Sequence, residues 1–345
     1  MIELERVSKF FGDTPAVIDL SLVVEEGELC CLIGPSGCGK TTTLKMINRM
    51  IEATSGTIRV GGRGITDFKP HELRRSMGYV IQSIGLFPHM TVMENICVVP
   101  RLFKWDRARA RTRAMELLEL FDMSPDGFKD KYPRELSGGQ AQRIGVARAL
   151  AGDPDILLMD EPFGALDPIS RANLQHQFVR IQSELRKTVV FVTHDVDEAV
   201  RLGSRIGLMR EGRLVQSDCP ERMLSRPGDA FVERFIGSER SLKRLSRLRV
   251  GDAMRPVSGE DGTVRSAQEN DPAAGGCRDA SGNPRSPSAP HGRSGVENPE
   301  LVLERGWDLR QALALLLQHG KQRLPVRDEN GRIRGELWLL DLLGV

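Results

Sequence analysis

The stretch "LIGPSGCGKTTTLKMI", residues 32–47, runs from an apolar segment through a glycine-dense turn into a helix-like pattern. Residues 28–33 predict a short buried strand and residues 40–50 predict a helix, so the turn connects the two. Glycines there let successive backbone N–H groups curl around a polyphosphate, because side chains would collide with it and positive φ costs other residues more. The helix start adds partial positive charge. The stretch therefore predicts a phosphate-binding loop.

The turn follows the spacing GxxxxGK[ST], which is the Walker A pattern of nucleotide-binding loops. In that pattern Lys40 contacts the β- and γ-phosphates, and the hydroxyl of Thr41 ligates Mg²⁺. An ordinary glycine turn is the alternative, which the strand before it and the helix after it disfavour. We predict that ATP is bound by Gly34, Pro35, Ser36, Gly37, Cys38, Gly39, Lys40, Thr41 and Thr42.

A second segment, "PDILLMDEPFGALDP" at residues 154–168, ends an apolar run on two carboxylates. Four apolar residues, 156–159, predict a buried parallel strand that is followed by Asp160 and Glu161. Two adjacent carboxylates are costly to desolvate unless a cation or a reacting group uses them. Asp160 suits Mg²⁺, through water, and Glu161 suits a general base that polarises the attacking water. A solvated strand end is the alternative.

The segment "ELSGGQAQRIGVARALA", residues 135–151, predicts another helix start that faces an anion. Ser137 is a good N-cap residue, and the two glycines after it leave the backbone uncovered. The chain therefore contains two helix starts that favour anions but only one loop with a lysine. This asymmetry needs an explanation.

The sequence LSGGQ at residues 136–140 resembles the signature of ATP-binding cassette (ABC) ATPases. In that family two cassettes dimerise head to tail, and each signature closes over the γ-phosphate held by the opposite Walker A loop. The resemblance covers residues 1–237 and implies an α/β fold, a P-loop cassette with a mixed sheet core and a helical subdomain. It also implies a second ABC subunit as partner, in a homodimer, and nucleotide contacts from Ser137, Gly138, Gly139 and Gln140.

Four further residues match motifs of the same family. Phe11 in "SKFFGD" is similar to the aromatic residue that stacks on adenine. Gln82 in "YVIQSIGLFPHM" matches the Q-loop glutamine, which senses Mg²⁺ and the attacking water. Asp167 in "ALD" matches the D-loop at the dimer seam, and His194 in "VVFVTHD" matches the histidine that contacts the γ-phosphate. Taken alone, Phe11 reads as a core or surface aromatic, Gln82 as a polar strand end and His194 as a structural residue.

The stretch "SIGLFPHMTVMENI", residues 83–96, bears on which protein the chain binds as its partner. In the family this face receives a coupling helix from a membrane permease, whereas apolar residues here could instead belong to the core of the helical subdomain. Both readings stay open for Leu86, Phe87, Met90, Val92 and Met93. This stretch of sequence resembles that of importers of quaternary amines such as glycine betaine, choline or carnitine. Related amino-acid importers have a similar stretch.

The resemblance implies an ATP-hydrolysing subunit of an importer for osmoprotectants such as glycine betaine, choline, carnitine or proline. A permease would be a direct partner and a substrate-binding protein an indirect one. The alternatives are an importer of amino acids or other small solutes and an ABC ATPase outside transport. Because 49 basic and 47 acidic residues give a formal charge of +2, nothing demands nucleic acid as a partner. The start lacks a signal-peptide pattern and no apolar run reaches ~18 residues, which predicts a cytosolic chain. The resemblance implies that this chain is a peripheral protein at the cytoplasmic face of the plasma membrane.

The C-terminal third divides into three parts. Residues 238–256 form a basic linker, and residues 257–299 are rich in Gly, Pro and Ser without any Leu, Ile or Phe, which predicts disorder. Residues 300–345 predict a small α+β region. An apolar helix face comes first, and "RLPVRDENGRIRGELWLL" predicts a strand, a turn at residues 330–331 and a second strand. The helix face consists of Leu309, Ala312, Leu313, Leu316 and Leu317.

This region resembles the second part of a cystathionine-β-synthase (CBS) motif, and "VGDAMRPV" at residues 250–257 resembles its beginning. A single interrupted motif departs from the usual tandem pair. Asp341 stands where the family has a ribose-binding aspartate, but Trp338 replaces the usual Ser or Thr. Nucleotide sensing and a role in interaction or ionic-strength sensing both stay open.

Overall fold

The computed structural model describes residues 1–83, 85–237, 245, 248–256 and 301–343. The chain divides into two compact units, Met1–Arg240 and Ser241–Val345. The segment 257–299, for which the sequence predicts disorder, lies outside the described residues, as do residues 238–244 and 246–247 of the basic linker. Within the described part, no helix is long and apolar enough to cross a membrane.

The first unit contains an antiparallel sheet in the order β2-β1-β4-β5. In β2 the buried residues alternate, because one face of the sheet packs on the core and the other faces solvent. The strands are β1 (Ile2–Phe11), β2 (Thr14–Val24), β4 (Ser55–Val60) and β5 (Arg63–Gly64).

A second, six-stranded sheet has the order β10-β9-β3-β8-β7-β6. Five of its strands are parallel and β10 is antiparallel to β9. Its central strands β3, β7 and β8 are buried along their whole length, as continuous apolar runs in parallel sheets predict. The strands are β3 (Leu29–Ile33), β6 (Met77–Val80), β7 (Ile156–Asp160), β8 (Thr188–Val192), β9 (Arg205–Arg210) and β10 (Arg213–Asp218).

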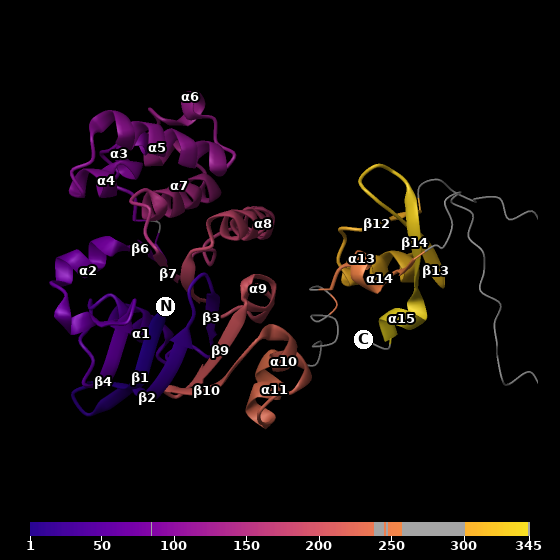
Figure 1. Ribbon diagram of the computed structural model, residues 1–345, viewed down its shortest axis with the longest axis horizontal. Helices are drawn as coiled ribbons and strands as arrows, with labels where there is room; N and C mark the ends of the chain where they lie inside the picture. The colour runs from indigo at the N-terminus through magenta and orange to yellow at the C-terminus, as the bar shows by residue number, and fades with distance from the viewer. Residues whose placement is uncertain (84, 238–244, 246–247, 257–300, 344–345) are drawn as a thin grey trace, which may run out of the picture. The chain divides into compact units, whose positions relative to one another are not determined.

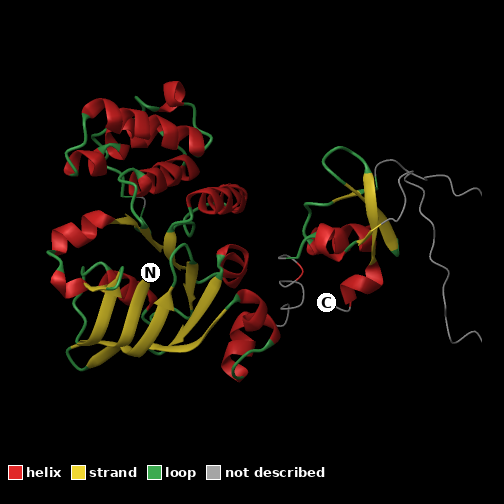
Figure 2. Cartoon of the chain, viewed as in Figure 1, coloured by secondary structure: helices red, strands yellow, loops and turns green. Residues whose placement is uncertain are grey.

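Helices cover both faces of the parallel sheet. Helix α1 contacts β2 of the first sheet and β7 and β8 of the second, whereas α3 to α7 gather at one end of the unit (Figure 1). Figure 2 shows that this end contains helices without strands, which confirms the predicted helical subdomain. The helices are α1 (Lys40–Ile47), α2 (Pro70–Ser76), α3 (Val92–Ile96), α4 (Val98–Leu102), α5 (Arg107–Leu120), α6 (Pro125–Phe128), α7 (Gly138–Leu150), α8 (Pro168–Leu185), α9 (Val196–Leu202), α10 (Pro220–Ser225) and α11 (Ala230–Ile236), with 3₁₀ turns at Ile65–Asp67 and Pro133–Glu135.

One expectation from the sequence is corrected here. Helix α1 ends at Ile47 and not at residue 50, since Asn48 caps it and Arg49 has a left-handed backbone with φ of 54°. The apolar residues near the Q-loop, for which two readings stay open, differ in burial. Val92 and Met93 belong to the buried core, while Phe87 is exposed.

The parallel sheet separates two apolar clusters. Leu29, Cys31 and Ile33 of β3 face the cluster that includes the helical subdomain. Cys30 and Leu32 face the cluster shared with α1 and the antiparallel sheet. This period of two is what a strand covered on both faces requires. The sheet therefore joins the two halves of the unit into one fold.

The second unit contains a small sheet in the order β11-β14-β13-β12. Strands β13 and β14 pair antiparallel, and Gly331 has φ of 75° in the turn between them, which confirms the predicted hairpin. Leu309, Ala312 and Leu316 are buried as predicted, whereas Leu317 is exposed because it lies at the edge of the helix face. The elements are α13 (Val250–Ala253), β11 (Arg255–Pro256), β12 (Leu303–Glu304), α14 (Leu309–Gln318), β13 (Arg323–Arg327), β14 (Ile333–Trp338) and α15 (Leu339–Leu343).

The resemblance of this unit to a CBS motif stays a prediction. The side chain of Asp341 lies outside the described residues. Trp338 is half-buried, and its ring lies between the guanidinium groups of Arg255 and Arg323, 5.2 and 5.1 Å from the ring centroid.

Loss of the Phe178 ring tests the packing of α8 on the parallel sheet. Its centroid lies 6.2 Å from that of Phe163 and 6.3 Å from that of Phe191, and all three rings are buried. We expect Phe178→Ala to lower the free energy of unfolding by ~3–5 kcal/mol, measured by urea denaturation. The control is Ile169→Ala on the same helix, 76% exposed. It should change that free energy by less than about 0.5 kcal/mol, and an equal loss in both variants would contradict the packing described.

Candidate functional site

Four parallel strands bring the predicted motifs to one edge of the sheet. The strands β3, β8, β7 and β6 are neighbours in that order, and each is followed by one motif. The lysine loop follows β3, His194 follows β8, Glu161 follows β7 and Gln82 follows β6. Because neighbouring strands lie about 4.8 Å apart, these segments are close together although up to 160 residues separate them in sequence.

The loop of residues 34–39 wraps around the side chain of Lys40. The buried ammonium Nζ donates to the carbonyl oxygens of Gly34 at 2.8 Å and Pro35 at 3.0 Å. Gly34, Gly37 and Gly39 all have positive φ, at 145°, 79° and 106°. The loop therefore holds a positive charge inside a curve of backbone that residues with side chains rarely adopt.

Thr41 and Asp160 are joined directly. The Thr41 hydroxyl donates to Asp160 Oδ1 at 2.9 Å, and Asp160 is buried. Burial raises the pKa of Asp160, although the Thr41 hydrogen bond and the charge of Lys45 oppose this shift. A bound cation would stabilise the ionised form, so this oxygen pair fits the donor set that Mg²⁺ prefers.

Gln82 lies in the same hollow as these two residues. The hollow has a volume of about 420 Å³ and includes four residues that the sequence analysis did not single out, Lys45, Tyr79, Ile81 and Ser83. Lys45 follows Thr41 by one helical turn, so helix periodicity could have identified it. Burial, together with the charge of Asp160, raises the pKa of Tyr79 to about 12. In the described part of the chain no three His, Cys, Asp or Glu side chains converge to hold a metal by themselves.

The carboxylate of Glu161 lies between two other predicted residues. Its Oε2 accepts a hydrogen bond from Gln82 Nε2 at 3.1 Å and lies 3.3 Å from Nδ1 of His194. Glu161 has a left-handed backbone with φ of 45°, and its N–H donates to the carbonyl oxygen of Val192 at 2.9 Å. Such a backbone is costly for a residue with a side chain and is often found at functional sites. The structure thus brings together the three residues predicted to be catalytic.

The signature caps its own helix. Ser137 Oγ accepts from the backbone N–H of Gln140 at 3.3 Å, and Gln140 Oε1 accepts from the N–H of Ser137 at 2.9 Å. This reciprocal pair is a capping box. A Cβ added to Gly139 would lie 3.5 Å from Ser170 Cβ, so the signature lies beside the start of α8.

Asp167 and Phe11 lie at the ends of elements and are exposed. Asp167 Oδ1 accepts from the N–H groups of Ile169 at 3.1 Å and Ser170 at 3.0 Å, and hydrogen bonds from Ser170 lower the pKa of Asp167. The ring of Phe11, 51% exposed, ends β1 and lies 5.1 Å from Lys9 Nζ. Its exposed face is open to stacking.

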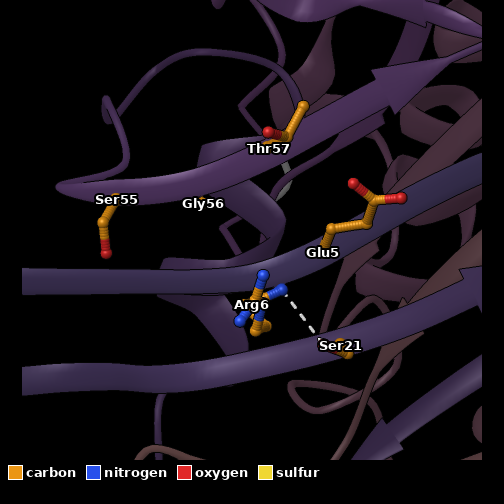
Figure 3. A pocket seen from close by; sticks show the side chains of 6 residues that line it. All are labelled: Glu5, Arg6, Ser21, Ser55, Gly56 and Thr57. Atoms are coloured by element: carbon orange, nitrogen blue, oxygen red, sulfur yellow. Dashed lines mark hydrogen bonds between the residues drawn. The ribbon is translucent and has the colours of Figure 1, made fainter.

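A larger hollow of about 650 Å³ lies on the antiparallel sheet (Figure 3). It contains none of the motif residues and forms where β1 bulges. Arg6 there has φ of 46° and donates its backbone N–H to Ser21 Oγ at 3.0 Å. A Cβ at Gly56 would lie 2.4 Å from the Arg6 carbonyl oxygen, so β4 crosses the bulge in close contact. Size alone therefore does not mark the functional site of this chain.

Known proteins share this arrangement of motifs. The family model described as ABC transporter matches residues 17–164, which contain the lysine loop, Gln82, the signature and both carboxylates. An osmoprotectant import ATP-binding protein of Salmonella typhimurium is 44% identical over 98% of this chain and 94% of its own length. A glycine betaine uptake system ATP-binding protein of Escherichia coli (strain K12) is 45% identical over 99% of both chains.

A solved structure shares the fold. It is a dimeric ATP-binding cassette in a post-hydrolysis state bound to ADP and Pi, with a TM-score of 0.57 and 34% identity over 64% of this chain and 99% of that chain. Fold and motifs together define a P-loop ATPase cassette. The chain belongs to the ABC transporter family, and it is one of the ATPases of that family. The predicted family and fold are therefore confirmed.

Two glycine variants separate steric collision from backbone strain in the lysine loop. A Cβ at Gly34 would lie 2.2 Å from the carbonyl oxygen of Met209, whereas nothing lies within 4 Å of a Cβ at Gly37. We expect Gly37→Ala to lower the free energy of unfolding by ~1–2 kcal/mol, the cost of a left-handed backbone. Gly34→Ala should lower it clearly more, in urea denaturation without nucleotide. Equal losses would contradict the close approach of β9 to the loop.

Proposed function

We propose that this chain is the ATP-hydrolysing subunit that energises a membrane importer of quaternary amine osmoprotectants. Two relatives that align over nearly the whole chain are an osmoprotectant import protein and a glycine betaine uptake protein, and glycine betaine is a quaternary amine. Choline, carnitine and proline complete the proposed set of cargoes. The sequence IGLFPHMTVMENI at residues 84–96 supports the same class.

The convergence of Gln82, Glu161 and His194 carries the proposed chemistry. Glu161 accepts a proton from water as the water oxygen attacks the γ-phosphorus of ATP and the bond to the ADP oxygen breaks. Gln82 orients the water, since its amide already touches the carboxylate. His194 donates a hydrogen bond to the γ-phosphate. Positioning and charge supply most of the rate in such reactions.

The lysine loop is the proposed site for the phosphates. Its backbone N–H groups and Lys40 bind the β- and γ-phosphates, and Phe11 stacks on the adenine. The hydroxyl of Thr41 and the carboxylate of Asp160, through water, would hold Mg²⁺, and Gln82 lies in the same hollow. When bound, Mg²⁺ neutralises negative charge on the phosphates.

A second copy of this chain is the proposed partner of the cassette. Ser137, Gly138 and Asp167 are exposed at neighbouring helix starts and would close over the γ-phosphate held by the other copy. The dimeric state of the similar cassette bound to ADP and Pi supports this arrangement. Closure on ATP and reopening after hydrolysis would then drive the membrane partner between its states.

The permease is proposed to contact the surface around Phe87. This ring is exposed next to the Q-loop, while Val92 and Met93 after it are used in the core. A contact here would connect the membrane partner to Gln82. The chain would then lie at the cytoplasmic face of the plasma membrane, and a substrate-binding protein would act through the permease.

Glu161→Gln tests the catalytic base. The amide keeps the shape but cannot accept a proton, so we expect ATP turnover to fall at least ~10²-fold, the usual contribution of a general base. ATP binding should persist, and the dimer should become long-lived, as measured by equilibrium dialysis and size-exclusion chromatography. Glu184→Gln, on an exposed residue of α8, is the control. Turnover of Glu161→Gln equal to that of this control would remove Glu161 from the role.

Uptake of labelled glycine betaine tests the cargo. In a strain without other glycine betaine carriers, deletion of the gene is expected to abolish uptake at high external osmolarity. The unchanged chain should restore it, and the Glu161→Gln variant should not, because transport requires hydrolysis. Undiminished uptake after deletion would refute the cargo proposal, and a loss of amino-acid uptake instead would favour the amino-acid alternative.

A further inference from the structure

Glu198 is a buried carboxylate that none of the motifs above uses. It lies on α9, one helical turn after His194, and is only 5% exposed. Its Oε1 accepts a hydrogen bond from Gln175 Nε2 of α8 at 2.9 Å. Glutamate is almost never buried to this degree without such partners. The free-energy cost of burying this carboxylate indicates that its hydrogen bonds are important to the fold.

On one side Glu198 fixes the turn that carries His194. The side chains of Thr193 and Glu198 line the same small cavity, and Thr193 Oγ1 accepts from the N–H of Asp195 at 3.0 Å. Asp195 Oδ1 in turn accepts from the N–H of Glu198 at 3.2 Å. Both neighbours of His194 are therefore held, whereas the imidazole itself is 64% exposed. The orientation of the imidazole toward Glu161 therefore depends on the backbone of these two neighbours.

On the other side the network reaches the segment between Glu161 and Asp167. Arg171 lies one turn before Gln175 on α8, and its guanidinium donates to the carbonyl oxygens of Leu166 at 3.1 Å and Gly164 at 3.5 Å. The positive charge of Arg171 acts on Glu198, and its Nε is buried without a hydrogen-bond partner among the described residues.

A small cavity adjoins both sides of this network. It is lined by residues of the hydrolytic site, Glu161 and His194, and by Arg171, Thr193 and Glu198 of the network. Gln175 has a second contact with α9, because Arg201 donates to its Oε1 at 3.2 Å. Helices α8 and α9 are thus joined by polar contacts directly behind the site.

We propose that Glu198 is a positioning residue for ATP hydrolysis. It holds the Thr193–His194 turn against α8. Together with Arg171 it also fixes the position of this turn relative to the segment that leads to Asp167. A purely structural contact at this place could be made by an apolar residue without burying charge. The inference rests on the proposed roles of Glu161 and His194.

Steady-state ATP hydrolysis by the full chain tests the inference. Glu198→Ala is expected to lower kcat about 10-fold with KM changed less than about twofold, since an interaction that acts on the reacting geometry affects kcat. Glu198→Gln should keep most of the activity, because its amide oxygen still accepts from Gln175. If Glu198→Ala does not fold, Gln175→Ala removes the same hydrogen bond and should lower kcat in the same way.

Gln177→Ala is the matched control. Gln177 is also a buried polar residue of α8, but its amide contacts Asp122 in the turn after α5 and not the site. This variant should lower the melting temperature and leave kcat unchanged. An equal fall of kcat in Gln177→Ala and Glu198→Ala would indicate general loss of packing and overturn the proposal.

His194→Ala separates the two levels of the argument. If His194→Ala is inactive while Glu198→Ala has full kcat, the positioning role is wrong and the proposed function stands. If His194→Ala hydrolyses ATP at the normal rate, the proposed role of His194 is wrong, and with it the inference about Glu198.

Discussion

The parallel alignment of β3, β8, β7 and β6 is the constraint on which the site depends. Parallel strands put their carboxyl ends at one edge, so a loop, a histidine, a glutamate and a glutamine from four parts of the chain meet there. The sheet is covered on both faces, by the helical subdomain together with α8 and α9 on one side and by α1 with the antiparallel sheet on the other. A slip of one residue in any pairing would turn a motif away from its partners.

Backbone conformation carries part of the chemistry at this edge. The glycines of the lysine loop adopt positive φ, and Glu161 does so without being a glycine. The loop needs this conformation to present N–H groups to phosphates. Strand β7 ends at the buried Asp160. The next residue, Glu161, has a left-handed backbone, which directs its carboxylate toward Gln82 and His194. Two adjacent carboxylates thereby have different surroundings.

Buried charge is the cost of this arrangement. Burial raises the pKa of both Asp160 and Glu198, and each accepts a hydrogen bond, from the Thr41 hydroxyl and the Gln175 amide respectively. Unpaired buried charges would destabilise the fold, so each is retained only with its partners. In Asp160 the charge is available to a cation next to the phosphates. In Glu198 it joins two helices behind the histidine, which explains why a residue outside the motifs is so thoroughly buried.

The sequence by itself determined the features that depend on local spacing. Three glycines around a lysine, two carboxylates after an apolar run and a serine-glycine helix start predicted the loop, strand β7 and helix α7, because turns, caps and strand periods involve residues close in the chain. Only the tertiary structure decided which of these segments lie next to one another. The neighbours of β7 are strands that begin about 80 residues earlier and 30 later, and no local pattern encodes that order. The burial of Glu198 against α8 could be found only in the fold, because burial is set by the packing of elements that lie far apart in the sequence.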